Sequence, residues 1–161
     1  MEYNNEEKFY GRRGLILKIK EVMIPDLTSV SEDTTIKEAL KILSRQRLVG
    51  LPVVNNEQHV IGIITESDII KACLPDYYKE LQNPSFLPDF NQFSKQAKKI
   101  AHLTVKKFMI HNVYTIEENT SRTEAANLLF RKNLRILPVV REGKLVGILT
   151  PSSLGKHAID K

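Results

Sequence analysis

The chain has 161 residues and a net charge of +5, and 42% of its residues are hydrophobic. This length allows one compact domain or two small domains that pack closely. The polar N-terminus lacks the apolar run of a secretory signal, and no apolar stretch is long enough to span a bilayer, so we expect a cytoplasmic protein with no membrane partner. Cys73 is the only cysteine, which excludes a disulfide within the chain.

The chain contains an internal repeat. Residues 15–54 align with residues 101–140, and from Leu17 to Val54 roughly 15 of about 38 positions are identical. The run LPVV occurs in both copies. After a deletion of one residue, residues 60–71 align with residues 145–156. One copy buries too little surface to be stable alone, so we expect the two to pack sheet to sheet.

Each copy predicts the element order β-α-β-β-α, which is an α/β (α+β) fold. A short strand is expected near residues 29–30 and 114–116. The apolar runs LPVV, VIGIIT and LVGILT are too short for helices and are rich in β-branched residues, which favours buried strands. The intervening segments NNEQ and REGK predict turns.

Two amphipathic helices are predicted in each copy. Apolar residues at helical spacing predict the first helix, with Thr34 and Thr120 placed to cap it. The second helix is expected to begin at Thr65 in the first copy and at Thr150 in the second.

The repeat divides the chain into four parts. They are a flexible N-terminal tail (residues 1–14), a first repeat (15–74), a helical insertion (75–100) and a second repeat (101–161). The insertion is rich in proline and aromatic residues and predicts a short helix, a loop broken by proline, and a helix over residues 91–101. It is either a structured linker or a lid or dimer contact.

The segment from Thr65 to Asp68 carries the clearest candidate chemistry. It follows a predicted strand and begins a helix, whose first turn presents free backbone N–H groups to an anion. The hydroxyls of Thr65 and Ser67 can donate to a phosphate, and the carboxylate of Asp68 can accept from both hydroxyls of a ribose. The same Thr-x-x-Asp spacing is also a capping signature that needs no ligand. Both interpretations remain open from the sequence.

The tandem order of LPVV and Gly-h-h-Thr-x-x-Asp (h, hydrophobic) resembles the cystathionine-β-synthase (CBS) domain pair, or Bateman module. The resemblance covers nearly all of the chain outside the tail and the insertion. It implies two β-α-β-β-α repeats related by a pseudo-two-fold axis, and a module that commonly dimerises. Proteins of this family bind adenine nucleotides, S-adenosylmethionine or cyclic dinucleotides and usually act as sensors.

The resemblance also implies where the ligand lies. In the family each site borrows walls from the other repeat, so His111, Asn112 and Val113 are expected to face the base. Arg135 occupies a position where family members place a basic side chain that contacts phosphates. Its counterpart in the first repeat is Val49, and an ordinary surface arginine is an equal alternative.

The second repeat departs from the motif. Thr150, Ser152 and Ser153 occupy the positions of Thr65, Ser67 and Asp68. A serine hydroxyl cannot bind a ribose diol as a carboxylate does, whereas Pro151 suits the first position of the helix. We therefore expect unequal clefts, with the one that contains Ser153 weak or empty.

Other chemistries have less support. The four histidines show no metal-ligand spacing, no nucleophile–base pair or paired carboxylates are recognisable, and Cys73 lies in a mostly apolar run. We therefore expect no metal, no cofactor and no enzymatic activity. The lysines between Lys95 and Lys107 are more typical of a solvated helix face than of a nucleic-acid site.

We thus expect a stand-alone regulatory module that binds AMP, ADP, ATP or S-adenosylmethionine between its repeats, forms a homodimer and signals to an unidentified effector protein. The alternatives are a ligand-free structural scaffold and a sensor of cyclic di-AMP. A binder of nucleic acid is the least favoured.

Overall fold

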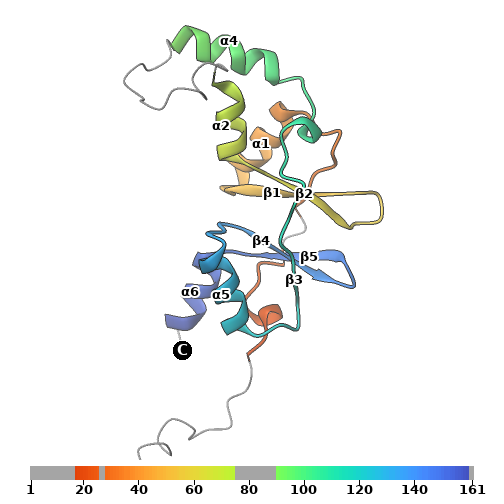
Figure 1. Ribbon diagram of the computed structural model, residues 1–161, viewed down its shortest axis with the longest axis vertical. Coiled ribbons are helices and arrows are strands. Elements are labelled where there is room, and N and C mark those ends of the chain that lie inside the picture. Colours follow the sequence, from red (N-terminus) through yellow and green to blue (C-terminus); the bar gives the residue numbers. More distant parts are fainter. Residues whose placement is uncertain (1–16, 26–27, 75–89, 160–161) are drawn as a thin grey trace, which may run out of the picture.

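A computed structural model describes residues 17–25, 28–74 and 90–159. Two halves, each of a small sheet covered by two helices, lie one above the other (Figure 1). The predicted tail, the short helix after Leu74 and the proline-broken loop lie outside the described residues.

The first half contains α1 (Ile36–Gln46), the antiparallel strands β1 (Gly50–Val54) and β2 (Val60–Thr65), and α2 (Glu66–Cys73). The second contains β3 (Ile116–Glu117), α5 (Arg122–Arg131), β4 (Leu137–Arg141), β5 (Lys144–Leu149) and α6 (Pro151–Ile159). β3 pairs in parallel with β4, and β4 pairs antiparallel with β5. The predicted helices and central strands are confirmed.

The first strand of each copy is shorter than predicted. Val30 makes only a single parallel bridge to Val53, and the strand expected from Tyr114 begins at Ile116. Each copy therefore contains a strand pair with a short third segment at one edge of its sheet.

The predicted helix caps are wrong by one residue. The N-cap of α1 is Thr35, whose hydroxyl accepts a hydrogen bond from the Glu38 amide, and the N-cap of α5 is Ser121, which bonds Glu124 in the same way. Extended backbone at Thr35 and Ser121 allows this geometry. The hydroxyl of Thr34 instead lies 3.3 Å from that of Ser31.

Each hydrophobic core includes a segment that precedes the other half in the sequence. The second-half core contains Ile19 and Val22, at and just after the short helix η1 (Ile19–Glu21). The first-half core contains Val105 and Met109, at and near η2 (Val105–Lys107). The two segments cross between the halves, so the repeats interlock.

The described part of the insertion is the helix α4 (Phe90–Ile100), close to the predicted residues 91–101. It packs on α2, and Phe93, Ala97 and Ile100 add to the first core. Among the described residues no helix of the second half corresponds to α4, so the described ends of the two halves differ (Figure 1).

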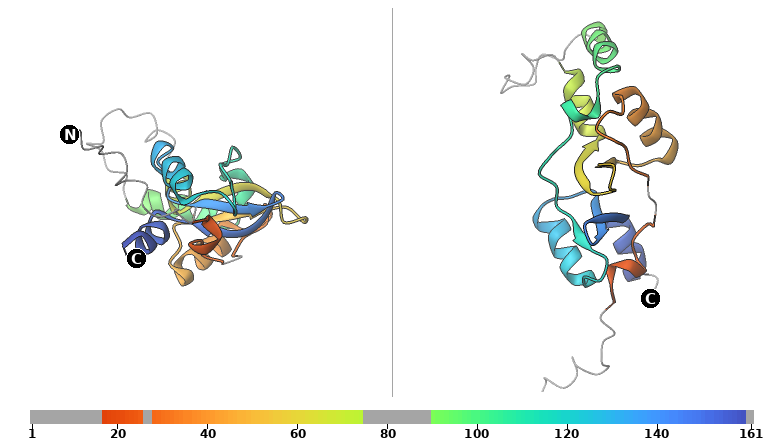
Figure 2. Two further views of the ribbon diagram at one scale, coloured as in Figure 1. Left: turned by 90° about the horizontal axis from the view of Figure 1, so that it is seen from below. Right: turned by 90° about the vertical axis from the view of Figure 1, so that its right-hand side faces the viewer.

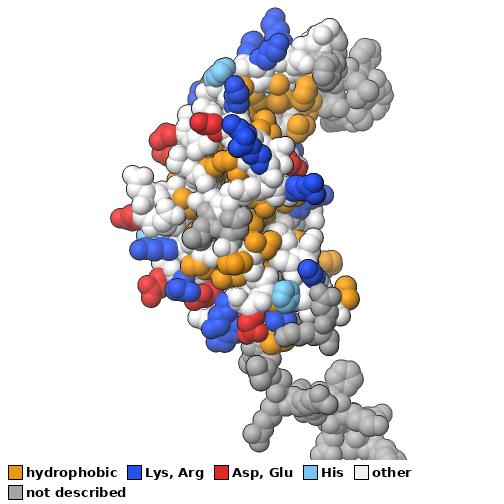
Figure 3. All heavy atoms as spheres, turned by 180° about the vertical axis from the view of Figure 1, so that it is seen from behind, with side chains coloured by type: hydrophobic (Ala, Val, Ile, Leu, Met, Phe, Trp, Pro, Cys, Tyr) orange, Lys and Arg blue, Asp and Glu red, His pale blue; other side chains and the backbone are white. Residues whose placement is uncertain are grey.

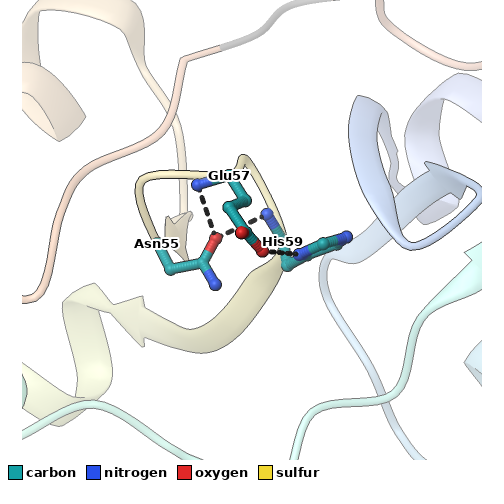
Figure 4. Close-up of polar contacts among 3 residues, drawn as sticks. All are labelled: Asn55, Glu57 and His59. Carbon is teal, nitrogen blue, oxygen red and sulfur yellow. Dashed lines mark hydrogen bonds and ion pairs between the residues drawn. The ribbon is translucent and has the colours of Figure 1, made fainter.

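The hairpin loops of the two halves meet at the edge opposite the helices. The carbonyl oxygen of Gln58 accepts from the Leu145 amide at 3.0 Å, and His59 bridges to Lys144. In the first loop, Asn55 Oδ1 accepts from the amides of Glu57 and His59, and His59 Nδ1 lies 3.3 Å from Glu57 (Figure 4). The predicted turns therefore also join the halves.

Within the described residues, no helix has the length and apolar character required to cross a membrane.

Candidate functional site

A cleft of about 390 Å³ lies where the start of α2 faces the second repeat. We call it the Asp68 cleft. Its first-repeat wall includes Thr65, Ser67 and Asp68. Its second-repeat walls include Asn112, Val113 and Arg135. Six of the seven residues predicted for the main site therefore line one cleft.

The seventh predicted residue, His111, does not line the cleft. It is exposed and lies between Ile110 and Asn112, which do. The resemblance indicated the correct segment. The direction of one side chain within an irregular segment cannot be predicted from the sequence.

Main-chain bonds hold the second-repeat wall against β2. The amides of Ile63 and Ile110 each donate to the carbonyl oxygen of the other, at 3.0 and 2.8 Å. A glycine at position 62 permits this close approach, because a Cβ atom there would lie 2.6 Å from Met109 Sδ. The glycine of the motif thus has a structural role in building the cleft.

The first turn of α2 forms a complete capping box. Asp68 Oδ2 accepts from the backbone amide and the hydroxyl of Thr65, at 3.0 and 2.6 Å. The Thr65 hydroxyl in turn accepts from the Asp68 amide at 3.3 Å. The capping interpretation is therefore satisfied in the folded chain.

This box changes what each group can offer a ligand. In the structure the Thr65 hydroxyl donates its only hydrogen to Asp68, so it could donate to a phosphate only by giving up this bond. All the side-chain bonds of Asp68 in the structure use Oδ2, which leaves the acceptor capacity of Oδ1 for a hydroxyl. Ser67 is exposed at the cleft and remains a candidate donor.

The cleft also contains residues that the sequence analysis did not select. Apolar walls come from Ile63, Ile110 and Ile136, and Lys71 adds a positive charge. Lys71 stands three residues after Asp68, a spacing that places both on one face of a helix. This spacing could have indicated Lys71 as a cleft residue from the sequence. The flat Tyr114 ring also lines the cleft, with Lys132 Nζ 5.1 Å from its centroid.

A second cleft, of about 440 Å³, occupies the position related to the first by the repeat. We call it the Ser152 cleft. It is lined by Thr150, Pro151 and Ser152 from the start of α6, and by Arg47 from the first repeat. Val49, Arg135 and Ile136 line both clefts, so the two adjoin near the pseudo-two-fold axis.

Ser153 caps α6 and does not line the Ser152 cleft. Its hydroxyl accepts from the Thr150 amide at 3.1 Å and lies 3.0 Å from the Thr150 carbonyl oxygen. The serine thus reproduces the capping role of Asp68 without its carboxylate.

Residues with other candidate chemistry lie apart from both clefts. Among the described residues, no group of three or more His, Cys, Asp or Glu side chains could hold a metal ion. Burial raises the pKa of the Cys73 thiol, which disfavours the reactive thiolate. Lysines 95, 98 and 99 are exposed on α4 at the end of the molecule farthest from the second repeat (Figures 1 and 3).

The fold and the paired clefts are those of a CBS pair. Residues 19–75 and 105–158 each match the model of the CBS domain. The chain therefore belongs to the CBS domain family, as the two interlocked repeats indicate.

Known proteins of the same architecture resemble nearly the whole chain. A CBS domain-containing protein of Dictyostelium discoideum is 34% identical over 137 residues, which are 84% of this chain and 87% of that protein. The crystal structure of the CBS-pair protein CBSX2 from Arabidopsis thaliana matches with a TM-score of 0.72 at 26% identity, over 89% of this chain and 94% of that chain. A crystal structure of CBSX2 in complex with AMP matches with a TM-score of 0.68 at 25% identity, over 89% and 96%.

A CBS pair also occurs inside a larger enzyme. Inosine-5'-monophosphate dehydrogenase of Methanocaldococcus jannaschii is 31% identical over 136 residues, which are 84% of this chain but only 22% of that enzyme. The similarity thus concerns a region about the size of this chain.

Proposed function

We propose that this chain is a regulatory module that binds an adenosine-containing ligand in the Asp68 cleft. The observation that carries the proposal is one cleft in which a carboxylate at a helix start faces apolar walls and a cation from the other repeat. The structural likeness to CBSX2, which has been crystallised with AMP, supports an adenine nucleotide as the ligand.

The residues of the cleft suit the parts of such a ligand. Oδ1 of Asp68 would accept from a ribose hydroxyl. The base would lie between Ile63, Ile110 and Val113, because apolar side chains cover the faces of a flat ring. Arg135 and the hydroxyl of Ser67 would hold the phosphate, since the amides of Glu66 and Asp68 at the start of α2 already donate to the Val49 carbonyl oxygen and the Thr65 hydroxyl.

The Ser152 cleft would bind a nucleoside poorly because it lacks a carboxylate at the position of Asp68. Arg47 and Arg135 give it positive charge, which favours an anion without a ribose. We therefore infer one nucleotide per chain.

A bound nucleotide would bridge the repeats and favour one arrangement of them, which an effector protein would recognise. In this proposal the module works in the cytoplasm and catalyses no reaction. The IMP dehydrogenase match fits this role, since there the CBS pair accompanies a separate enzyme portion.

Thermal unfolding with AMP, ADP, ATP, S-adenosylmethionine and cyclic di-AMP tests the proposal. A ligand at about 100 times its Kd stabilises the fold by about 2.7 kcal/mol and raises the melting temperature. We expect this for an adenine mononucleotide or S-adenosylmethionine, and a clearly smaller shift in Asp68→Ser at the same ligand concentration. A shift with cyclic di-AMP alone would identify the other ligand class.

The capping box favours a second candidate, a ligand-free scaffold, because it gives Thr65 and Asp68 a complete structural role. On that account no compound raises the melting temperature, and Asp68→Ala lowers it in the absence of any ligand. Stabilisation of the wild type by one compound contradicts the scaffold.

A further inference from the structure

A pocket of about 480 Å³ lies beside the Asp68 cleft, where α2, α4 and the segment around η2 meet. We call it the α2–α4 pocket. Asp68 and Lys71 line both this pocket and the Asp68 cleft, so the two spaces adjoin at α2. α4 contributes Gln96 and Ile100, and η2 contributes Lys107. Because α4 packs on α2 at the end of the first half (Figures 1 and 2), the helix of the insertion forms one wall of the pocket.

Three side chains from three elements can donate hydrogen bonds to a group in this pocket. Lys71 and Lys107 are exposed, and Gln96 is half-buried. Within the part of the chain that the structure describes, neither lysine forms an ion pair and the Gln96 amide makes no hydrogen bond. The neighbouring Lys106 instead pairs with Glu32 at 3.0 Å. Two ammonium groups and an amide without protein partners suit an anion such as phosphate.

The second repeat lacks this set of donors. In the internal alignment Lys107 corresponds to Glu21, whose carboxylate lies 3.4 Å from Arg122 Nη2. The described residues of that half include no helix that corresponds to α4. The repeat that has the carboxylate of Asp68 therefore also has the positive pocket, whereas the repeat that has Ser153 carries an acidic residue at the equivalent position. This common difference connects the pocket with the ligand of the Asp68 cleft.

The border between the two spaces determines which part of a nucleotide can reach the pocket. A ribose that binds Oδ1 of Asp68 has its 2' and 3' oxygens at this border, while its base and its 5' substituent extend from other atoms into the Asp68 cleft. A group attached to the 2' or 3' oxygen can therefore extend past Asp68 toward Lys71 and Lys107. The other ribose hydroxyl still donates to Oδ1.

We propose that the α2–α4 pocket binds a phosphate carried on the 2' or 3' oxygen of the ribose, so that the preferred ligand is a ribose-phosphorylated adenine nucleotide. This inference rests on the proposed function of the Asp68 cleft. Lys71, Gln96 and Lys107 bind the ribose phosphate, and Arg135 binds the phosphate at the 5' position. The two lysines offset the negative charge of Asp68, which would otherwise repel a second phosphate.

ATP and S-adenosylmethionine use the pocket less well. Their charged groups are attached at the 5' position, and both of their ribose hydroxyls are unsubstituted. Neither compound therefore places an anion beside Lys107 when its ribose binds Asp68. A phosphate on the ribose is the feature that the α2–α4 pocket distinguishes.

Isothermal titration calorimetry with AMP, adenosine 3',5'-bisphosphate and adenosine 2',5'-bisphosphate tests the proposal. We expect at least one bisphosphate to bind the wild type about 10-fold or more tightly than AMP, because charge-assisted hydrogen bonds are strong. The isomer that binds more tightly shows which ribose oxygen carries the phosphate. If AMP binds and neither bisphosphate binds more tightly, the inference is wrong while the proposed function stands. If none of the three binds, both are wrong.

Variants of Lys107 test where the second phosphate lies. Lys107→Gln should reduce the preference for the bisphosphate to less than about 3-fold, and Lys107→Glu, with the charge of Glu21, should reverse it. The Kd for AMP should change little, because Lys107 does not line the Asp68 cleft. The matched control is Lys106→Gln, since Lys106 is also exposed but pairs with Glu32 and does not line the pocket. An equal loss of preference in Lys106→Gln and Lys107→Gln would reflect general charge attraction and overturn the proposal.

Discussion

Asp68 combines a structural and a proposed functional role in one carboxylate. Oδ2 closes the cap of α2 through Thr65, while Oδ1 keeps its acceptor capacity in the cleft. The second repeat shows that a serine at this position forms an equivalent cap, since Ser153 bonds the Thr150 amide. The start of α6 therefore shows what to expect of Asp68→Ser, which should keep the cap of α2 and remove the carboxylate.

The variant Asp68→Ser should bind AMP about 10- to 100-fold more weakly, because hydrogen bonds to a charged group are worth about 1.5–3 kcal/mol. Its melting temperature without ligand should stay near that of the wild type, since the cap is retained. Isothermal titration calorimetry gives the affinity. The reciprocal Ser153→Asp is the control and should leave binding at the Asp68 cleft unchanged. Equal affinity of Asp68→Ser and the wild type contradicts the role of the carboxylate.

The glycines before each helix start permit two chain segments to cross. A Cβ atom at Gly147 would lie 2.7 Å from the carbonyl oxygen of Ile24, whereas at Gly62 the nearest atom is Sδ of Met109. A methionine side chain can rotate away, but a bonded backbone carbonyl cannot move without breaking its contact with Ile148. Gly147→Ala should therefore lower the free energy of unfolding by about 1–3 kcal/mol, and Gly62→Ala by less. Urea unfolding measures both, and the reverse order would contradict this explanation.

At the scale of elements, an ion pair joins the segment after β3 to the end of β4. Arg141 Nε and Nη2 donate to the two carboxylate oxygens of Glu118, at 2.6 and 2.8 Å. These bonds lower the pKa of the Glu118 carboxyl from its ordinary value. The backbone carbonyl oxygen of Glu118 also accepts from the Lys20 amide, so the pair supports the crossing of η1 into the second core.

The lowered pKa of Glu118 predicts a pH-dependent stability. A group with a depressed pKa in the folded state stabilises the fold above its unfolded pKa of about 4.5 and loses this effect as the pH falls through the folded pKa. Arg141→Gln should therefore be less stable than the wild type at pH 7, and the difference should shrink as the pH falls below about 4.5. Urea unfolding at several pH values measures it. A difference that does not change with pH would mean that the carboxylate contributes nothing through the pair.

At the scale of the whole molecule, the interlocked cores make the repeats one folding unit. The first core needs Val105 and Met109, and the second needs Ile19 and Val22. Residues 15–74, predicted as the first repeat, therefore lack part of their own core. We expect this fragment to be unfolded by circular dichroism and to show no cooperative thermal transition. A cooperative transition at a temperature near that of the full chain would show that the repeats fold independently.

The sequence predicted what is local and periodic. The internal alignment yielded the order of elements, and the departure at Ser153 indicated unequal clefts. The crossing of η1 and η2 escaped prediction because those segments carry no periodic pattern and their partners are distant in the chain. The sequence could not show which partner the Thr65 hydroxyl takes, since its one hydrogen can serve the cap or a ligand, and in the folded chain it donates to Asp68.

The most direct test of the central claim is a crystal structure of the chain with AMP. The account predicts one AMP in the Asp68 cleft, with its ribose hydroxyls at Asp68, its base between Ile110 and Val113, and its phosphate toward Arg135. The Ser152 cleft should contain no nucleoside. An AMP molecule bound only in the Ser152 cleft, or at neither cleft under saturating AMP, would contradict it.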